Sequence, residues 1–237
     1  MEKEIIRNDE NINELNILKS ELWDLKNELN SNKKKLEEKT EFSDDEVKKI
    51  VKNATERNLI SLKLNNLKKI TNKQAAELSK VRGLELNWLE SLTDEQATEL
   101  WKINGPLFLD WLKNLTDEQA NKLGKIKYLT MNWLKSITDK QAAIFGKAKV
   151  LSLNWLSKLT DKQAFELWNV FDLSLNGLKS LTDEQSKWLS NSKILYLKWL
   201  NEISDTQAKH LSKVWSLIIY RSVLTPKQNE ILKNRIK

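Results

Sequence analysis

Apolar residues follow two different periods along this chain, and the two patterns occur in turn. Short runs with an apolar residue at every second position lie at residues 62–64, 84–86, 107–109, 129–131, 151–153, 173–175 and 195–197. Period two places these side chains, mostly leucines, on one face of a strand. After each run the apolar residues take helical spacing, as in Ala97, Leu100 and Ile103, which predicts a short helix. The chain is therefore expected to alternate strand and helix.

A hydroxyl residue opens each predicted helix. These residues are Thr71, Thr93, Thr116, Thr138, Thr160, Thr182, Ser204 and Thr225. They recur every 21 to 23 residues, and the longest interval contains Pro106, in a predicted loop. A glutamine follows each hydroxyl three residues later, which is the spacing of a capping box. Regular repeats of this length indicate a solenoid. The column of Thr, Asp and Gln residues that recurs at the helix starts is assigned a structural role there.

The repeated sequence, best seen as LELNWLESLTDEQATEL from residue 84 to 100, resembles bacterial leucine-rich repeats of the LxLNGLxxLTDEQAxxL kind. The resemblance covers about three quarters of the chain. It implies an α/β fold, a leucine-rich-repeat solenoid in the form of a horseshoe arc. About eight strands would form a concave parallel sheet, with short helices on the convex side, and such proteins usually serve recognition. Leu89 and its equivalents stand where the family has an asparagine, so no asparagine ladder is expected at that position.

The first 58 residues have a different pattern. Leucines occur at positions 15, 18, 22, 25, 29 and 36, a heptad spacing that predicts a coiled-coil helix within residues 1–40. Two roles stay open for this helix: pairing with a second copy of the chain, or covering the open end of the solenoid. Ser43 and Glu46 form another capping box, and residues 41–58 are interpreted as an N-terminal capping unit. The solenoid is expected at residues 59–237, with a C-terminal cap from about residue 216.

The outward strand positions and the column that follows them are the candidate partner-binding surface, because the inward leucines are required for the core. The candidate residues are Trp88, Phe108, Asp110, Trp111, Asn132, Trp133, Asn154, Trp155, Asn176, Tyr196, Lys198 and Trp199. The five tryptophans occupy one repeat position, which Gly177 interrupts. Two interpretations stay open: the indoles stack to close the strand-to-helix loops, or they form an exposed platform for a protein, a sugar or a base. In the second case Gly177 leaves a gap for a partner's side chain.

Charge supplies an alternative function. From residue 59 onward the chain has 28 Lys or Arg against 18 Asp or Glu, whereas residues 1–58 have 12 against 15. The basic excess therefore belongs to the repeats, and binding of nucleic acid or another acidic surface is the first alternative to a protein partner. Lysines near the ends of the helices are also explained by the helix dipole. A structural spacer or oligomerisation scaffold is the second alternative.

Little in the sequence indicates catalysis. The chain has one histidine, His210, which is interpreted as a surface residue, and no cysteine. Phosphate-binding glycine motifs are absent. We expect no enzyme activity and no cofactor. The charged N-terminus lacks the apolar core of a signal peptide, and no apolar stretch is long enough for a transmembrane helix, so a cytoplasmic protein without a membrane partner is expected.

Overall fold

The computed structural model describes residues 19, 22–23, 26–27 and 39–233. The chain divides into two compact units, residues 1–39 and 40–237. Most of the predicted N-terminal helix lies outside the described residues. Five of its described residues are helical and exposed: Lys19, Leu22, Trp23, Lys26 and Asn27. Lys39 and Thr40, at the end of the predicted range, are exposed and not helical. Pairing of this helix with a second copy, or capping by it, stays a prediction.

The second unit alternates short strands and short helices, as the two periods predict. The strands are β1 (Leu62–Lys63), β2 (Leu84–Glu85), β3 (Leu107–Phe108), β4 (Tyr128–Thr130), β5 (Val150–Ser152), β6 (Asp172–Ser174), β7 (Ile194–Tyr196) and β8 (Ser216–Ile218). The α-helices are α2 (Asp44–Glu56), α3 (Asn72–Leu78), α4 (Asp94–Leu100), α5 (Asp117–Leu123), α6 (Asp139–Phe145), α7 (Asp161–Glu166), α8 (Asp183–Leu189), α9 (Asp205–Leu211) and α10 (Pro226–Lys233), with a 3₁₀ turn η1 (Arg221–Val223) before α10.

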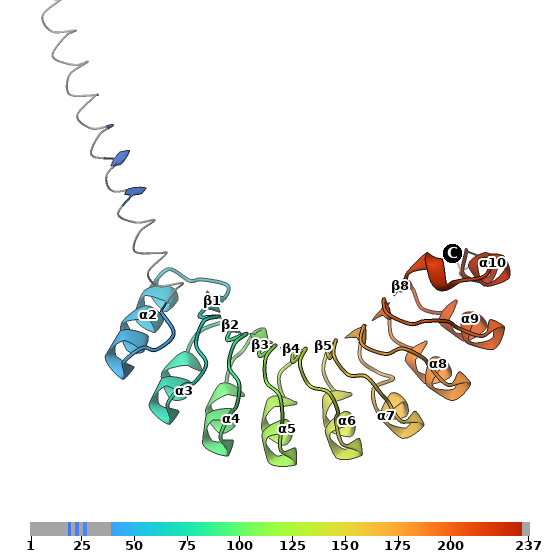
Figure 1. Ribbon diagram of the computed structural model, residues 1–237. Helices are drawn as coiled ribbons and strands as arrows, with labels where there is room; N and C mark the ends of the chain where they lie inside the picture. The colour runs from blue at the N-terminus through green and yellow to red at the C-terminus, as the bar shows by residue number, and fades with distance from the viewer. Residues whose placement is uncertain (1–18, 20–21, 24–25, 28–38, 234–237) are drawn as a thin grey trace, which may run out of the picture. The chain divides into compact units, whose positions relative to one another are not determined.

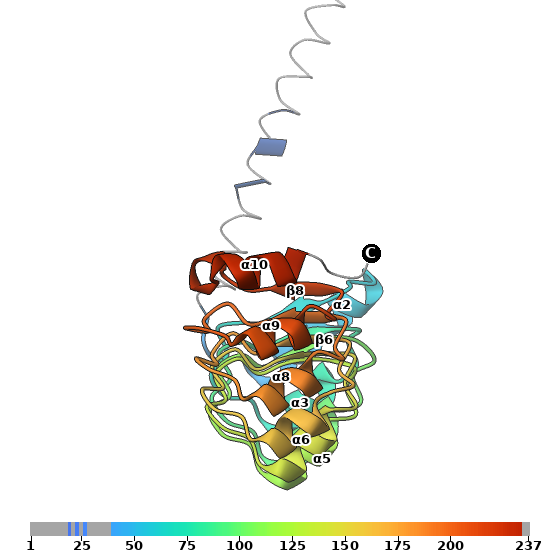
Figure 2. The same cartoon turned by 90° about the vertical axis from the view of Figure 1, so that its right-hand side faces the viewer.

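Within the described residues the strands form one parallel sheet in the order β1 to β8. Leucines pair with leucines from strand to strand, as Leu84 does with Leu62 and Leu107. The extra residue of the longest repeat precedes β3, so it leaves this register intact. The sheet follows the inner side of an arc, and the helices lie on the outer side (Figure 1). Viewed from the end, the repeats lie one behind another (Figure 2). The predicted fold class is confirmed.

The core is a strip that runs from repeat to repeat. One repeat contributes seven buried apolar side chains: Leu84, Leu86, Leu89, Leu92, Ala97, Leu100 and Ile103. The leucine that replaces the family's asparagine belongs to this set, since Leu89 is fully buried. Burial of apolar surface stabilises a fold by about 25 cal/mol per Å². In this stack the leucines are buried only where neighbouring repeats cover one another.

The glutamine of each capping box also joins two repeats. Gln163 Oε1 accepts from the backbone N–H of Thr160 at 3.0 Å, and its Nε2 donates to the carbonyl oxygen of Ile137, in the preceding repeat, at 2.9 Å. Both bonds recur at Gln74, Gln96, Gln119, Gln141, Gln185, Gln207 and Gln228. The hydroxyls also cross between repeats, as in the bond from Thr138 Oγ1 to Asp117 Oδ1. The structural role predicted for this column is confirmed.

A longer helix covers each end of the core of the second unit. Helix α2 begins with a capping box of Ser43 and Glu46 and buries Val47, Val51 and Ala54. These three residues belong to the same apolar core as the repeats, which supports the proposal that residues 41–58 are a capping unit. At the other end α10 buries Leu232. No helix in the described ranges has the length and apolar character needed to cross a membrane.

Candidate protein-binding surface

The concave face presents the polar side chains that alternate with the buried leucines. An asparagine ladder runs across it, two residues after the end of each strand. Asn132 Oδ1 accepts from the backbone N–H of Asn154 at 3.2 Å, and Asn154 Oδ1 accepts from that of Asn176 at 3.3 Å. Asn176 Oδ1 does the same for Lys198 at 3.0 Å. The ladder therefore exists, two positions before the leucine position at which it was not expected.

Hydroxyl side chains on the neighbouring strand positions join this ladder. Ser152 Oγ donates to Asn132 Oδ1 at 2.6 Å, and Ser174 Oγ donates to Asn154 Oδ1 at 2.5 Å. The asparagines are half-buried, and their carbonyl oxygens are already bonded within the fold. Their role toward a partner stays a prediction, and it rests on the amide hydrogens rather than on the oxygens.

The ladder is interrupted between β2 and β3. Asp110 Oδ1 accepts from Thr130 Oγ1 at 2.6 Å and from Asn132 Nδ2 at 2.8 Å. Asn87 Oδ1, in contrast, is buried without a hydrogen-bond partner in the part of the chain that the structure describes. The longest repeat interval falls at this junction, so the inserted residue and the break in the ladder coincide.

Four consecutive indoles stack beside the ladder. Ring centroids lie 5.3 Å apart for Trp88 and Trp111, 5.0 Å for Trp111 and Trp133, and 4.7 Å for Trp133 and Trp155. The first and last pairs are close to parallel, at 15° and 18°. Aromatic pairs at these distances contribute more to stability than the area they bury accounts for. The centroid distances match the spacing of neighbouring strands, about 4.8 Å.

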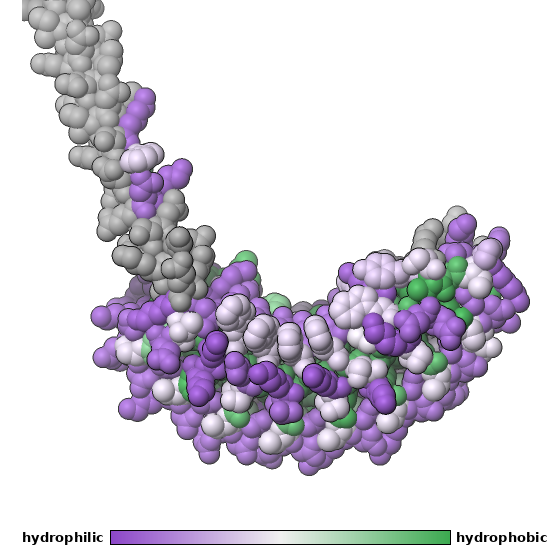
Figure 3. All heavy atoms as spheres, viewed as in Figure 1, coloured by the Kyte–Doolittle hydropathy of each residue, from purple (hydrophilic) through white to green (hydrophobic). Residues whose placement is uncertain are grey.

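The indoles are stacked and exposed at once. Trp88 and Trp155, at the ends of the stack, keep 43% and 44% of their surface accessible, and Trp199 keeps 42%. Trp111 and Trp133, inside the stack, are half-buried. Figure 3 shows a row of side chains of intermediate hydropathy following the arc, beside a row of hydrophilic ones. The backbone N–H of Trp133 donates to the Asp110 carbonyl at 2.7 Å, so the strand-to-helix turn fixes the position of this indole. Stacking and partial exposure thus occur together in this row, and its use as a platform for a partner stays a prediction.

The structure does not bring all candidate residues together. Phe108 and Tyr196 lie on β3 and β7, with three strands between them, so about 19 Å separates them at a strand spacing of about 4.8 Å. At the N-terminal end of the sheet Glu85 pairs with Lys63 at 3.1 Å. The surface is thus an extended strip rather than one compact site.

A second set of exposed side chains follows the opposite edge of the sheet, where the strands begin. We call it the basic edge. It consists of Lys80, Arg82, Lys102, Lys125, Lys127, Lys147, Lys149, Lys193 and Lys213, all exposed. Glu77 and Glu99 pair with Lys80 and Lys102, each at 2.7 Å, whereas the cations at 125, 127, 147 and 149 have no carboxylate partner among residues 39–233.

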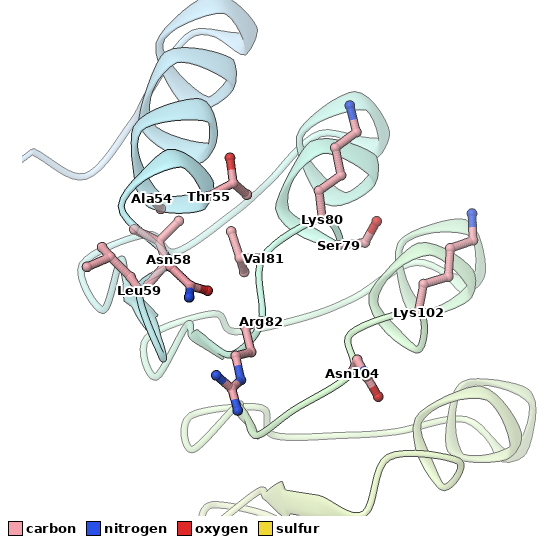
Figure 4. A pocket seen from close by; sticks show the side chains of 11 residues that line it. Ala54, Thr55, Asn58, Leu59, Ser79, Lys80, Val81, Arg82, Lys102 and Asn104 are labelled. Carbon is pink, nitrogen blue, oxygen red and sulfur yellow. The ribbon is translucent and has the colours of Figure 1, made fainter.

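The basic edge includes one hollow of about 460 Å³ beside the end of α2. Figure 4 shows Lys80 and Lys102 extending in the same direction from neighbouring repeats, while Arg82 extends the other way. Exposed aromatic rings lie near the lysines further along, since Lys125 Nζ is 4.5 Å from the Trp101 ring centroid. Burial raises the pKa of Asp172, at the start of β6. Only part of the basic edge, the lysines at the helix ends, was assigned from the sequence.

His210 is half-buried rather than a surface residue. Its Nδ1 lies 2.8 Å from Ser186 Oγ and 3.1 Å from the Asp183 carbonyl oxygen. Ser186 is fully buried on α8 and donates to that same carbonyl at 2.7 Å. A hydroxyl enclosed in this way is out of reach of a substrate. In the described ranges no three His, Asp or Glu side chains gather closely enough to hold a metal ion.

No sequence family and no curated protein matches this chain. Solved structures do. An internalin (inlF) from Listeria monocytogenes is similar with a TM-score of 0.50 at 15% sequence identity, over 76% of this chain and 50% of the internalin. Internalin C2 (inlC2) from the same organism is similar with a TM-score of 0.48 at 18% identity, over 66% of this chain and 73% of the other.

The fold is a leucine-rich-repeat solenoid. This assignment rests on the parallel sheet on the inner side of the arc, on the repeated strand and helix, and on the likeness to internalins, which are leucine-rich repeat proteins. The chain spans half the length of the inlF internalin. At this level of identity the likeness concerns the fold alone, and the function of the solenoid has to be argued from its own surface.

Proposed function

We propose that this solenoid is a non-enzymatic module that binds a partner protein through its concave face and the tryptophan row, Trp88, Trp111, Trp133, Trp155 and Trp199. The observation that supports it is the stack of four indoles, each of which is partly accessible. Tryptophan is enriched among the residues that dominate binding energy at protein interfaces. Trp88, Trp111, Trp133 and Trp155 are already held by stacking, and the last three also by backbone bonds. These four side chains therefore lose little entropy on binding.

The concave face beside the row suits a protein partner as well. The ladder fixes a line of half-buried amides at strand spacing, and amide hydrogens suit the carbonyl groups of a polypeptide. Most of its charged groups are already bonded within the fold, as Asp110 and Glu85 are. Such a face is polar, without a strong field of one sign, and its specificity would come from shape and hydrogen bonds.

Two triple variants test the proposal. Trp111→Ala, Trp133→Ala and Trp155→Ala remove the centre of the row. Trp101→Ala, Trp168→Ala and Trp215→Ala remove the same number of indoles, all exposed, elsewhere on the solenoid. Affinity capture with quantitative mass spectrometry should find a protein enriched by the wild type and the control variant and lost with the first variant. Equal loss with both, or no protein that separates them, would refute the proposal.

Binding of nucleic acid is the alternative that the basic edge favours. Four lysines, at positions 125, 127, 147 and 149, have no carboxylate partner among residues 39–233, and aromatic rings lie near Lys125 and Lys149. Such cations and rings are the groups that phosphates and stacked bases require. A filter-binding assay with single-stranded DNA at two salt concentrations tests it. Affinity that falls steeply with salt supports it, and no retention at low salt rejects it. A spacer, the second alternative, predicts that neither triple variant changes any interaction.

The bacterial type of the repeats and the self-association of the N-terminal helix also stay proposals. The first rests on the LTDEQA motif. The second rests on the heptad leucines and on the exposure of Leu22 and Trp23, at 68% and 65%.

A further inference from the structure

The tryptophan row has a gap at Gly177, and a groove lies there. Its volume is about 340 Å³, and it is lined by Trp155, Trp199, Tyr220 and Lys198 together with three asparagines of the ladder. We propose that this groove binds an extended acidic segment of the partner protein, with one aromatic side chain of that segment inserted between Trp155 and Trp199. This inference rests on the function proposed above and names the chemistry of the partner.

The gap is fixed by the backbone. A Cβ atom at position 177 would lie 2.6 Å from the carbonyl oxygen of Asn154 and 2.8 Å from that of Leu156. Only glycine fits at such distances without a shift of the chain. Since the row skips one repeat, two strand spacings, about 9–10 Å, separate Trp155 and Trp199 along the sheet. That interval accommodates one planar ring stacked between two indoles.

The charge of the groove selects an acidic ligand. Lys198 replaces asparagine in the ladder column, and the groove lining contains no Asp or Glu. Lys198 is half-buried, and no carboxylate pairs with it among residues 39–233. Lys179 Nζ lies 5.1 Å from the ring centroid of Trp199, which adds a second cation beside the groove. Carboxylates on either side of the inserted ring would meet these ammonium groups.

The shape of the groove suits an extended peptide. Its lining residues come from five successive repeats, so it is about 19 Å long at a strand spacing of about 4.8 Å. An extended chain of about six residues spans that length. Asn154 Nδ2 and Asn176 Nδ2 each donate one hydrogen to a serine of the ladder. Each amide group has a second hydrogen, which suits a carbonyl of the bound peptide.

The probe is a blocked peptide of sequence Gly-Ser-Asp-Tyr-Asp-Ser-Gly, added to the full chain. NMR should show shifts of the indole N–H signals of Trp155 and Trp199 and none for Trp215. Matched peptides with Ala in place of Tyr, or Lys in place of both Asp, should bind at least about tenfold more weakly, as expected for loss of an interface anchor. Equal binding of all three peptides, or shifts confined to other indoles, would overturn the proposal.

Protein variants complete the test. Lys198→Glu and Trp199→Ala should each weaken the peptide at least about tenfold, whereas Lys213→Glu, a charge reversal on the basic edge, should change it less than about twofold. Unchanged affinity of Lys198→Glu contradicts the proposal, and since Lys198 lies outside the core this variant stays informative if Trp199→Ala unfolds. Oligothymidine that shifts Trp155 and Trp199 while the peptide does not assigns the groove to nucleic acid instead.

These results separate the groove from the wider function. If the triple variant of the row loses its captured partner while Lys198→Glu and Trp199→Ala retain it, the proposed function stands and the groove proposal fails. If all of them retain it, the proposed function fails.

Discussion

Replacing Gln163 by Glu tests the bonds that join one repeat to the next. Glutamate serves as well as glutamine in a capping box, and Glu46 does so in α2, which has no repeat before it within residues 40–233. In Gln163→Glu the carboxylate can still accept from Thr160, but it has no hydrogen to donate to the Ile137 carbonyl. The variant therefore isolates the bond between repeats from the cap.

The expected cost follows from burial and protonation. Gln163 is 8% exposed, so an ionised carboxylate would face a carbonyl oxygen with little solvent, a loss of about 1–3 kcal/mol or more. Protonation sets an upper limit, because a neutral acid can donate the missing bond. At pH 7 that costs about 3.7 kcal/mol for a Glu with an unfolded pKa of about 4.3. We expect a loss of about 2–4 kcal/mol in the free energy of unfolding.

The pH dependence gives the decisive assay. Burial raises the folded-state pKa of the introduced Glu above its unfolded value, so the loss is complete above the folded pKa and disappears as pH falls below about 4.3. Urea unfolding of variant and wild type at pH 7 and near pH 4 measures the difference. Gln207→Glu, with the same bond to the Leu181 carbonyl at 2.8 Å but at a less buried position, should lose less. A loss below about 0.5 kcal/mol at pH 7, or one that does not shrink in acid, would refute the reasoning.

Three further predictions follow from other parts of the chain. Leu22→Glu should abolish self-association of the full chain in analytical ultracentrifugation, because it places a charge in the heptad seam; a wild type that is monomeric at all concentrations contradicts pairing. Lys227 Nζ lies 2.6 Å from Asp205 Oδ2, and its hydrogen bond holds the pKa of Asp205 below the usual range. This contact therefore stabilises α10 at pH values above the usual Asp pKa. The stabilisation is lost as pH falls through the folded-state pKa of Asp205. Lys227→Ala should raise the Asp205 pKa in an NMR titration, and an unchanged pKa would show that the ion pair is not formed. Trp133→Ala should shift the tryptophan emission to longer wavelength by exposing Trp111 and Trp155; an unchanged spectrum argues against the stack.

The repeat made most of the fold predictable from sequence. Leucine at every second position gave the strands, and the Thr-Gln pairs gave the helix starts, because both depend on local periodicity and on contacts three residues apart. The second bond of each glutamine joins residues 25 or more apart, as with Gln163 and Ile137, which are 26 apart. A signal was present, since every repeat helix has Gln where α2 has Glu46. The signal is read by comparing the two side chains, because glutamine has hydrogens to donate and an ionised glutamate has none.

The candidate site was less predictable because its side chains share partners. The column of Asn132, Asn154 and Asn176 was interpreted from sequence as outward residues for a partner, and the structure shows their oxygens bonded within the ladder. The tryptophan row was found from its repeat position, but whether the indoles were packed or exposed depends on ring orientation, which periodicity does not encode. The groove also depends on Tyr220, which takes the position of Lys198 in the following repeat. The strand motif was not found there from sequence, because that repeat reads Leu217-Ile218-Ile219 in place of Leu-x-Leu.

The central proposal is that the tryptophan row forms the contact surface. Hydroxyl-radical footprinting of the chain with and without its captured partner tests it most directly, because each indole is modified in proportion to its exposure. The account predicts protection of Trp88, Trp155 and Trp199 in the complex and no change at Trp215, which is 74% exposed. Protection of Trp215 with the row unchanged would contradict it.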